Sequence, residues 1–194
     1  MFSLKNKIAV VTGGGSGIGR AISTLFAKQG AIVHIIELNE SAALDAVEEI
    51  NALNLDNKVV VHACNVAIQN EVKTVFEKIG LVHILVNNAG IAHIGNVENT
   101  SEADFDRVFS INVKGVYNCL QAAIPLMRSG GGGVILNMAS IAALVGIPDR
   151  FAYSMSKGAV LAMTIATAKD YLEIIFAAIL FRLLEYTRHL WMVF

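Results

Sequence analysis

The sequence contains little proline and little cysteine, and its two cysteines give no sign of a metal site. Its 194 residues include two prolines and two cysteines. Cys64 and Cys119 lie far apart in the chain, and neither has neighbours spaced as metal ligands. We therefore expect two buried, reduced thiols, as in a cytoplasmic protein, and no metal site. The first residues, Met1–Lys7, are too few and too polar for a signal peptide, which also favours the cytoplasm.

A charge surplus and a membrane-spanning run are also missing. Fifteen Lys and Arg residues against sixteen Asp and Glu residues leave a net charge of −1, so we expect no nucleic-acid partner. The C-terminal apolar run, Ile174–Phe181, has eight residues before Arg182 interrupts it. A bilayer-spanning helix needs roughly 20. The sequence therefore predicts no membrane partner.

Short apolar segments alternate with segments of helical pattern. The expected strands are Lys7–Val11, Ile32–Glu37, Lys58–His62, His83–Val86 and Gly133–Met138. The expected helices are Gly17–Gln29, Ser41–Leu53, Gln69–Ile79 and Phe105–Met127. This order predicts βαβ units with right-handed crossovers. The fold class is then α/β, a Rossmann-type doubly wound parallel sheet in three layers, and strands buried on both faces account for much of the 55% hydrophobic content.

A glycine-rich loop, Thr12–Gly19, joins the first strand directly to the first helix. Glycines allow a tight turn and a close backbone approach to a pyrophosphate, and the helix N-terminus offers free N–H groups to that anion. A plain flexible turn is the alternative, but a strand before the loop and a helix after it favour dinucleotide binding. The expected cofactor-binding residues of this loop are Gly13, Gly15, Ser16, Gly17, Ile18 and Gly19.

An acidic residue, Glu37, ends the second strand, eighteen positions after Gly19. A carboxylate at this place can accept hydrogen bonds from the adenosine ribose, and it would repel the 2′-phosphate of NADP. Neither Ser16 nor Leu38, which could both lie near that phosphate, is basic. We therefore expect NAD rather than NADP, with Glu37 and Leu38 at the ribose. The alternative is a solvated carboxylate at a strand end.

Three further motifs follow in order, and together they carry a family resemblance. They are Asn87-Asn88-Ala89-Gly90, Asn112 within Ile111-Asn112-Val113, and Ser140 followed thirteen residues later by Tyr153-Ser154-Met155-Ser156-Lys157. With the TGxxxGxG loop, this set resembles the short-chain dehydrogenase/reductase family, in its simple single-domain branch, over roughly residues 5–172. A YxxxK motif on its own would not indicate this family.

The resemblance implies roles for these residues. Asn87, Ala89 and Gly90 would stabilise the sheet and line the adenosine side of an NAD site. Ser140 would hold the substrate oxygen, and Asn112 would hold a water of a proton relay. Lys157 would bind the nicotinamide ribose, next to Tyr153.

The residue types also fit the chemistry. Tyr153 and Lys157 are four positions apart, so on a helix they share one face. A lysine ammonium beside a phenol favours the phenolate form. Tyr153 can then give a proton to a carbonyl, or take one from an alcohol, while a hydride moves to or from the nicotinamide.

Two further positions lie near the expected cofactor or substrate. The family usually has Asp-Val after the third strand, where the acid meets the adenine amino group, and this chain has Asn65-Val66. An asparagine oxygen can still accept that hydrogen bond, so we expect both residues at the cofactor, with weaker binding. His93 follows the Asn-Asn-Ala-Gly motif, and we interpret it as a structural loop histidine rather than a catalytic one.

The chain departs from the family pattern after Leu172. The family has further strands, a Pro-Gly turn and a substrate lid, whereas residues 173–194 contain no Pro, Gly or Asn. We expect residues 1–172 to form the NAD(P)-binding domain and residues 173–194 to form an apolar, helical tail. A truncated or frameshifted gene would explain it. The last strands of the family would then be missing, and the fifth strand would be an exposed edge.

The sequence leaves two functions open. The first is an NAD-dependent oxidoreductase that acts on a small-molecule alcohol or carbonyl compound. The second is an inactive dinucleotide-binding or dimerisation module. The resemblance implies a possible homodimer, through the helices that begin near Asp104 and Phe151. It does not identify the substrate.

Overall fold

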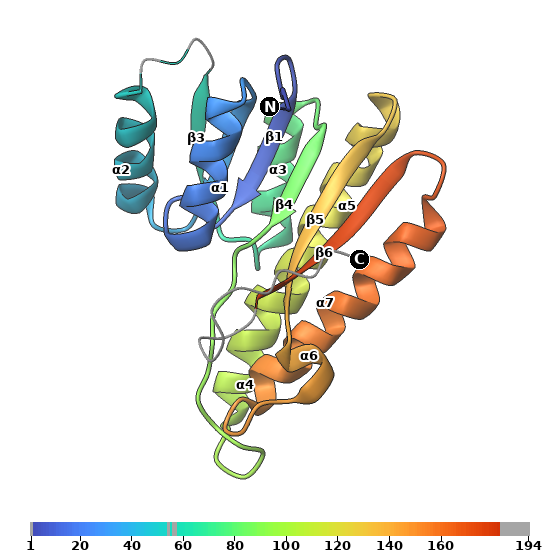
Figure 1. Cartoon of the computed structure of the whole chain (residues 1–194). Helices are drawn as coiled ribbons and strands as arrows, with labels where there is room; N and C mark the ends of the chain where they lie inside the picture. Colours follow the sequence, from blue (N-terminus) through green and yellow to red (C-terminus); the bar gives the residue numbers. More distant parts are fainter. Residues whose placement is uncertain (1, 54, 56–57, 183–194) are drawn as a thin grey trace.

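A computed structural model of the chain describes residues 2–53, 55 and 58–182. Its centre is a six-stranded parallel sheet with the strand order β3-β2-β1-β4-β5-β6 (Figure 1). The strands are β1 (Ile8–Thr12), β2 (Ile32–Glu37), β3 (Val59–Ala63), β4 (Ile84–Asn87), β5 (Gly133–Ser140) and β6 (Ile175–Arg182). The first five coincide with the expected strands to within two residues at each end.

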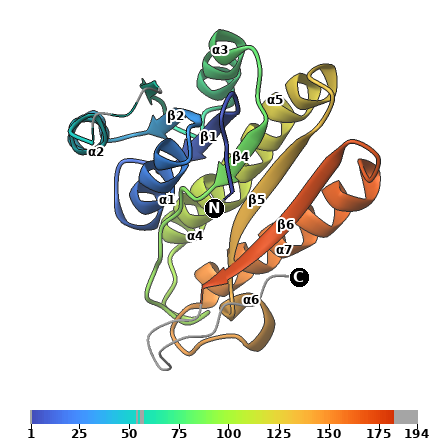
Figure 2. The same ribbon diagram turned by 45° about the horizontal axis from the view of Figure 1, so that its top comes forward.

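Helices cover both faces of this sheet. They are α1 (Gly17–Lys28), α2 (Glu40–Asn51), α3 (Gln69–Ile79), α4 (Glu102–Phe109), α5 (Gly115–Ser129), the short α6 (Ala142–Val145) and α7 (Phe151–Asp170). Helices α1 and α2 lie on one face, and α3, α5 and α7 lie on the other (Figures 1 and 2). This is the expected three-layer, doubly wound α/β fold.

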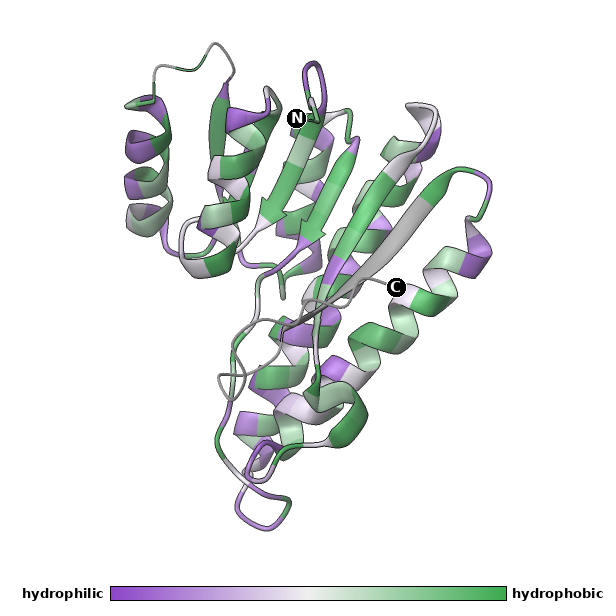
Figure 3. Cartoon of the chain, in the orientation of Figure 1, coloured by the Kyte–Doolittle hydropathy of each residue, from purple (hydrophilic) through white to green (hydrophobic). Residues whose placement is uncertain are grey.

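Alternate residues of the central strands enter two separate cores. Val11, Val33 and Ile35 pack on the side of α1 and α2, whereas Val10 and Ile36 pack on the side of α3 and α5. All five side chains are fully buried. Because these strands are apolar on both faces, they read as continuous hydrophobic segments in the sequence. Figure 3 shows β1, β4 and β5 coloured mainly as hydrophobic.

The expected helix Phe105–Met127 is not one helix. It consists of α4, a π-helical turn η1 (Ser110–Lys114) and α5. Gly115 begins α5, and a side chain there would come within 2.8 Å of Val66 Cγ2, so the helix passes very close to the loop after β3. Pro125 lies inside α5 without ending it. A π-helical turn inside an α-helix is frequent at functional sites, and this one contains Asn112.

The expected helical tail is wrong for Ile175–Arg182. These residues form β6, which pairs in parallel with the whole of β5, from Gly133 opposite Ile175 to Ser140 opposite Arg182. The strand β5 is therefore not an exposed edge. Periodicity cannot separate a short apolar strand from a buried helix, and β5 offers a row of backbone N–H and C=O groups that a strand can pair with and a helix cannot. The rest of the expected tail, residues 183–194, lies outside the described residues.

No helix in the described part of the chain has the length and apolar character needed to cross a membrane. Within the same residues, no group of three or more His, Cys, Asp or Glu side chains could hold a metal ion. Cys64 and Cys119 are both buried and free, as expected. Burial raises the pKa of the Cys64 thiol to about 11, so this thiol stays protonated at neutral pH.

Candidate active site

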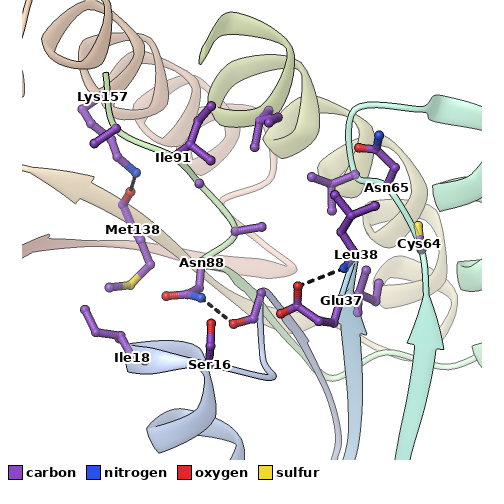
Figure 4. A pocket seen from close by; sticks show the side chains of 18 of the residues that line it. Ser16, Ile18, Glu37, Leu38, Cys64, Asn65, Asn88, Ile91, Met138 and Lys157 are labelled. Carbon is purple, nitrogen blue, oxygen red and sulfur yellow. Dashed lines mark hydrogen bonds between the residues drawn. The ribbon is translucent and has the colours of Figure 1, made fainter. Parts of the chain in front are cut away.

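A cleft of about 430 Å³ opens at the carboxyl ends of the strands, where the strand order reverses between β1 and β4 (Figure 4). In open α/β sheets, ligands bind at such a reversal. The cleft is lined by Gly13, Ser16, Gly17, Ile18, Ile36, Glu37, Leu38, Cys64, Asn65, Val66, Asn88, Ala89, Gly90, Ile91, Ala92, Ile111, Met138, Ala139, Tyr153 and Lys157. Twelve of the fifteen residues expected at the cofactor line it, and Gly15, Gly19 and Asn87 do not.

The glycine-rich loop forms one wall of the cleft, and close packing explains its glycines. Gly13 has φ +62°, a conformation that strongly favours glycine. A side chain at Gly19 would overlap the Gly13 carbonyl oxygen and lie 2.5 Å from Asn88 Nδ2. A side chain at Gly15 would come within 2.9 Å of the Ala43 backbone nitrogen. Gly15 and Gly19 therefore shape the loop from behind.

The first turn of α1 points into the cleft. Ser16 occupies the N-cap position, but its side chain makes no capping hydrogen bond, and Gly17 begins the helix. Ser16, Gly17 and Ile18 all line the cleft. An α-helix leaves its first N–H groups without partners inside the helix, and its N-terminus attracts anions. The loop and the helix end together form a cradle for a phosphate group.

Asn88 and Thr12 fasten the glycine-rich loop to the end of β4. The Asn88 side-chain amide donates to the backbone oxygens of Thr12 and Gly13, at 3.0 and 3.1 Å. Thr12 Oγ1 accepts from the backbone N–H groups of Asn88 and Ala89, both at 3.0 Å. Asn88 lines the cleft, although we expected its neighbour Asn87 there. Side chains alternate along a strand, so two adjacent asparagines at a strand end face different ways.

Asn87 faces into the protein and belongs to a buried chain of hydrogen bonds. Its Nδ2 donates to Asn137 Oδ1 on β5 at 2.8 Å. Asn137 Nδ2 in turn donates to Thr164 Oγ1 on α7, also at 2.8 Å. The three residues are at most 4% exposed. They attach α7, which carries Tyr153 and Lys157, to the two strands beside the cleft.

The Glu37 carboxylate closes the side of the cleft at the end of β2. It accepts from the backbone N–H groups of Leu38 (3.0 Å) and Asn39 (3.2 Å) through Oε1. Through Oε2 it accepts from the N–H of Gly15, at 3.3 Å. These contacts hold the carboxylate between the strand end and the glycine-rich loop. The negative charge therefore has a fixed position on the cleft wall, as Figure 4 shows.

Asn65 and Val66 lie in the loop after β3, and both line the cleft. The Asn65 side-chain oxygen accepts from the Ala67 N–H at 3.0 Å, so it already takes part in a turn. The Asn65 backbone N–H donates to Glu71 Oε2 at 2.8 Å. A carbonyl oxygen has two lone pairs. Asn65 can therefore still accept one hydrogen bond from a ligand.

Tyr153 and Lys157 lie one turn apart in the first half of α7, and both line the cleft. Lys157 Nζ is 5.8 Å from the centre of the Tyr153 ring. It donates to the Met138 carbonyl oxygen at the end of β5, at 2.6 Å. Lys157 is 7% exposed, and this burial lowers its pKa to about 8. The Lys157 ammonium therefore loses its proton more readily than that of an exposed lysine, because burial lowers its pKa.

Asn112 lies behind the cleft, in the π-helical turn. Its Oδ1 accepts from the Ile91 N–H at 2.8 Å, and its Nδ2 donates to the Ile91 carbonyl oxygen at 2.9 Å. The Nδ2 also donates to Ser156 Oγ, which donates to the Tyr153 carbonyl oxygen. A side chain at Gly90 would lie 3.1 Å from Asn112 Oδ1 and 3.8 Å from Lys157 Nζ. Asn112 therefore positions the loop after β4 and the first turn of α7.

Ser140, the expected holder of the substrate oxygen, does not line the cleft. It ends β5 and is 1% exposed. Its hydroxyl oxygen accepts from the Ala142 N–H at 3.2 Å. The structure thus brings Tyr153 and Lys157 to the cleft directly, and it keeps Asn112 and Ser140 covered.

His93 lies away from the cleft, under the loop that follows it. Its Nδ1 is 3.7 Å from Asp104 Oδ1, and its buried Nε2 has no hydrogen-bond partner among the described residues. The interpretation of His93 as a loop residue agrees with this position.

Several lining residues were not expected from the sequence, among them Ile36, Cys64, Asn88, Ile91, Ala92, Ile111, Met138 and Ala139. Most of them lie at or just after the carboxyl end of a strand. Met138 and Ala139 could have been predicted, because β5 is recognisable in the sequence and ligands bind at the carboxyl ends of such strands.

Known proteins share this arrangement. The sequence profile of the short chain dehydrogenase family matches residues 7–179. An uncharacterized oxidoreductase of Thermotoga maritima is 40% identical over 171 residues, which are 88% of this chain and 68% of the relative. A cyclohexanol dehydrogenase of Acinetobacter sp. is 36% identical over 175 residues, 87% of this chain and 68% of the relative.

Among solved structures, a short chain dehydrogenase/reductase from Burkholderia phymatum in complex with NAD superposes with a TM-score of 0.86. It is 30% identical, and the match covers 93% of this chain and 66% of that one. The chain thus spans about two thirds of the length of these relatives. Solved neighbours hold either NAD or NADP. The sequence match, the strand order and the cleft agree, and the chain belongs to the short-chain dehydrogenase/reductase family of oxidoreductases.

Proposed function

We propose that the chain is an NAD-dependent oxidoreductase that interconverts a small alcohol and its ketone or aldehyde, with Tyr153 as the general acid and base. The observation that carries this proposal is the shared cleft. One end of it is the glycine-rich cradle, and the other end has Tyr153 next to a buried lysine. A dinucleotide is long enough to reach from the first to the second.

The residues of the cleft fit a dinucleotide. A Cβ at Gly13 would lie 3.0 Å from Ala89 Cα, and Gly19 has no room for one, so the loop stays open only with glycine. The loop and the first turn of α1 would hold the pyrophosphate, and Glu37 would hold the adenosine ribose. Asn65 and Val66 would lie at the adenine. When bound, NAD(H) would accept or supply the hydride.

The chain's own residues would handle the proton. In the direction of reduction, the Tyr153 hydroxyl gives its proton to the carbonyl oxygen. Lys157 is buried beside the ring, and its positive charge stabilises the phenolate that remains. In the direction of oxidation, the phenolate takes the proton of the alcohol. Asn112 would support this step by fixing Ser156 and the Tyr153 carbonyl, through the hydrogen bonds described above.

The preference for NAD follows from the position of Glu37. Its carboxylate is held by three backbone N–H groups at the cleft wall. A 2′-phosphate would have to approach this fixed negative charge, and like charges at close range disfavour binding. We infer that NADH binds more tightly than NADPH.

The test is the consumption of NADH by the purified chain in the presence of a ketone such as cyclohexanone. We expect Tyr153→Phe to lower kcat by about 10²–10⁴-fold, the usual range for a lost acid–base group. NADH affinity should change little, because the ring remains. Turnover by Tyr153→Phe at the rate of the unmodified chain would contradict the assignment of Tyr153.

One observation favours a second function, an inactive dinucleotide-binding module. Ser140 is 1% exposed and does not line the cleft, so in this conformation its hydroxyl is not available to hold a substrate there. The same experiment separates the two functions. Saturable NADH binding without consumption of NADH by any ketone of a broad panel would support the module.

A cytoplasmic location and a homodimer stay predictions. Support for a dimer comes from exposed aromatic side chains on the expected contact helices: Phe109 and Tyr117 along α4 and α5, and Phe151 at the start of α7, which are 42%, 46% and 43% exposed. Sedimentation equilibrium of the purified chain would measure the oligomeric state. A single species with the mass of one chain at all concentrations would exclude the dimer.

A further inference from the structure

A second cavity lies between helices α3 and α5, on the face of the sheet opposite α1 and α2 (Figures 1 and 2). Its volume is about 340 Å³, and it shares no lining residue with the cleft that contains Tyr153. We call this cavity the α3/α5 groove. It is lined by Gln69, Lys73, Phe76 and Glu77 of α3 and by Asn118, Gln121, Ala122, Pro125 and Leu126 of α5.

Asn118 brings a buried hydrogen-bond acceptor to the groove. The residue is 1% exposed, and its Nδ2 donates to the Val66 carbonyl oxygen at 2.8 Å. Because a carbonyl oxygen only accepts, the nitrogen of the Asn118 amide must be the atom on that side. The other atom, Oδ1, is buried and has no hydrogen-bond partner among the described residues. Buried polar atoms nearly always have a partner, so a donor is expected to meet Asn118 Oδ1.

A proline frees a second acceptor on the same helix. Pro125 lies inside α5 and lines the groove. In a regular α-helix the N–H of residue 125 would donate to the carbonyl oxygen of Gln121, and proline has no N–H. Gln121 also lines the groove. The α5 side of the groove therefore has more acceptors than the helix itself can satisfy.

The side-chain donors at this end of the groove are already engaged. Gln69 Nε2 donates to Gln121 Oε1 at 2.6 Å, which joins α3 to α5. Gln121 Nε2 donates to the Tyr117 hydroxyl oxygen at 3.1 Å. A ligand that complements the groove should therefore supply a donor of its own.

Apolar side chains form much of the rest of the groove. Phe76 is 1% exposed and belongs to the core on this face of the sheet, and Ala122 and Leu126 pack against that core. A hydrocarbon surface that covers these side chains is stabilised by its removal from water. A cavity of about 150 Å³ holds one benzene ring. The groove therefore has room for a molecule of two fused rings.

The charges on the groove wall cancel. Lys73 and Glu77 are the two charged lining residues, and Lys73 Nζ lies 3.9 Å from Glu77 Oε1. Both side chains are largely exposed. A charged ligand would lose its hydration without meeting a surplus of opposite charge. The groove therefore favours an uncharged ligand.

We propose that the α3/α5 groove binds a small, uncharged, largely apolar molecule with one N–H or O–H donor, and that this donor bonds to Asn118 Oδ1. The apolar part of the molecule rests on Phe76, Ala122 and Leu126. The groove is separate from the cleft, so this site does not depend on the proposed oxidoreductase function, and binding alone tests it.

The test compares indole with benzofuran, two fused-ring molecules of nearly the same shape. Indole has an N–H donor where benzofuran has a ring oxygen. Titrations of the isotope-labelled full chain, followed by NMR chemical shifts, give a dissociation constant for each molecule. We expect indole to bind about three- to tenfold more tightly, the factor that one net hydrogen bond gives. Equal affinities, or no saturable binding of indole, would overturn the proposal.

Asn118→Leu removes the acceptor and keeps a side chain of similar size. Indole and benzofuran should then bind with equal affinity. Asn70→Leu is the matched control, because Asn70 is exposed on α3 and does not line the groove. This control should keep the preference for indole. A preference that survives Asn118→Leu in folded protein would overturn the proposal, and thermal melting verifies that both variants fold.

Ala122→Leu tests the place of binding without removing a polar contact. The larger side chain fills part of the groove, and both molecules should bind at least about fivefold more weakly. Ala162→Leu is the control, since Ala162 is exposed on α7, outside the groove. It should leave both dissociation constants unchanged. Equal affinities of the two variants for indole would show that indole binds elsewhere, and the proposal would fail.

A second copy of the chain is the competing occupant, because Tyr117, which bonds to Gln121, is 46% exposed on α5. The indole titration is therefore repeated at several chain concentrations, with sedimentation equilibrium as the measure of oligomeric state. A dissociation constant that does not change supports a small-molecule site. Indole binding that is lost as dimers form would make the groove an interface between copies and would overturn the proposal.

Discussion

The two halves of the cleft are built in different ways. On the side of β1, β2 and β3, the lining residues directly follow strand ends, and backbone groups and short side-chain contacts hold them. Glu37 contacts three backbone N–H groups there. On the side of β5 and α7, Tyr153 and Lys157 lie on a long helix, and buried side chains fasten that helix to the strands through Asn137 and Thr164.

The two halves therefore depend on different kinds of contact. The cofactor half, formed by the glycine-rich loop and the ends of β2 and β3, depends on glycines that leave no room for a side chain beside Asn88 and the Gly13 carbonyl oxygen. The catalytic half, formed by the end of β5 and by α7, depends on hydrogen bonds between buried side chains that are 27 to 50 positions apart. We therefore expect local steric changes to damage NADH binding, and buried polar changes around α7 to damage stability.

The largest effect is expected from two glycine substitutions that differ only in their surroundings. Gly19→Ala places a Cβ against the Gly13 carbonyl oxygen in the loop. Gly158→Ala places one on α7, where nothing lies within 4 Å. The first should weaken NADH binding by at least about 10²-fold, roughly 3 kcal/mol. The second should keep NADH binding and raise the free energy of unfolding by about 0.5–1 kcal/mol, the usual gain of alanine over glycine in a helix.

NADH titrations and urea unfolding of both variants measure these changes. Equal NADH affinities of Gly19→Ala and Gly158→Ala would show that the loop has more room than the structure gives it. The cofactor half would then not depend on local packing.

A smaller effect is expected when the buried polar chain is cut. Thr164→Val keeps the shape of the side chain but removes the oxygen that accepts from Asn137 Nδ2. A buried donor without a partner costs about 1–3 kcal/mol, and urea unfolding should show a loss of this size. Thr74→Val is the control, because the Thr74 hydroxyl bonds to Asn70 on the exposed side of α3. Its effect should stay within about 0.5 kcal/mol, and an equal loss would argue against the anchoring role of Thr164.

A pair of histidines on β2 and β3 should make stability depend on pH. His34 Nδ1 and His62 Nε2 are 2.8 Å apart, so one nitrogen must donate to the other. Burial, and then the nearby charges of His62 and Lys58, lower the pKa of His34 from 6.5 to about 4. Burial, with Lys78 nearby, also lowers the pKa of His62.

The direction in which stability changes with pH follows from proton binding. Between pH 6.5 and 4 the unfolded chain binds more protons at His34 than the folded chain does, so the free energy of unfolding falls as the pH drops. We expect His34 to contribute about 1–2 kcal/mol to this fall, after a discount for its partial exposure. The variant His34→Leu should show a correspondingly smaller fall in urea unfolding between these pH values. An unchanged pH dependence would rule out the pair as its source.

The smallest effect is expected from Glu37→Ala. This change removes the negative charge at the wall of the cofactor half and leaves its glycines in place. The ratio of the NADPH and NADH dissociation constants should fall about tenfold, roughly 1.4 kcal/mol. Fluorescence titrations measure both constants. A ratio that does not change would mean that another residue sets the cofactor preference.

The sequence predicted the cofactor half better than the catalytic half. Strands β1 to β5 are apolar and bounded by turn residues, and Glu37 and the glycine-rich loop follow strand ends, so local patterns are sufficient there. The partners of Asn137 and Thr164 could not be predicted, because nothing in the local pattern shows which buried groups meet across α7. The π-helical turn at Asn112 has no local signature either.

Strand β6 shows the limit of periodicity most clearly. Residues 175–182 mix helix-favouring residues (two alanines and one leucine) with strand-favouring isoleucines and phenylalanines, and they pair along the whole of β5. Pairing with the otherwise unpaired edge of β5 makes these residues a strand, and that edge exists only once the sheet has formed. Ser140 is a similar case, since its place in the sequence predicted a role at the substrate but its burial depends on the surrounding fold.

The most direct test of this account is a titration of the purified chain with NADH and, separately, with NADPH, following the fluorescence of the bound nicotinamide. We expect saturable NADH binding with at least about tenfold preference over NADPH, because the glycine-rich cradle is formed and the Glu37 carboxylate lies beside it on the cleft wall. If soluble, folded chain bound neither nucleotide, the proposed NAD site and the function that rests on it would both be contradicted.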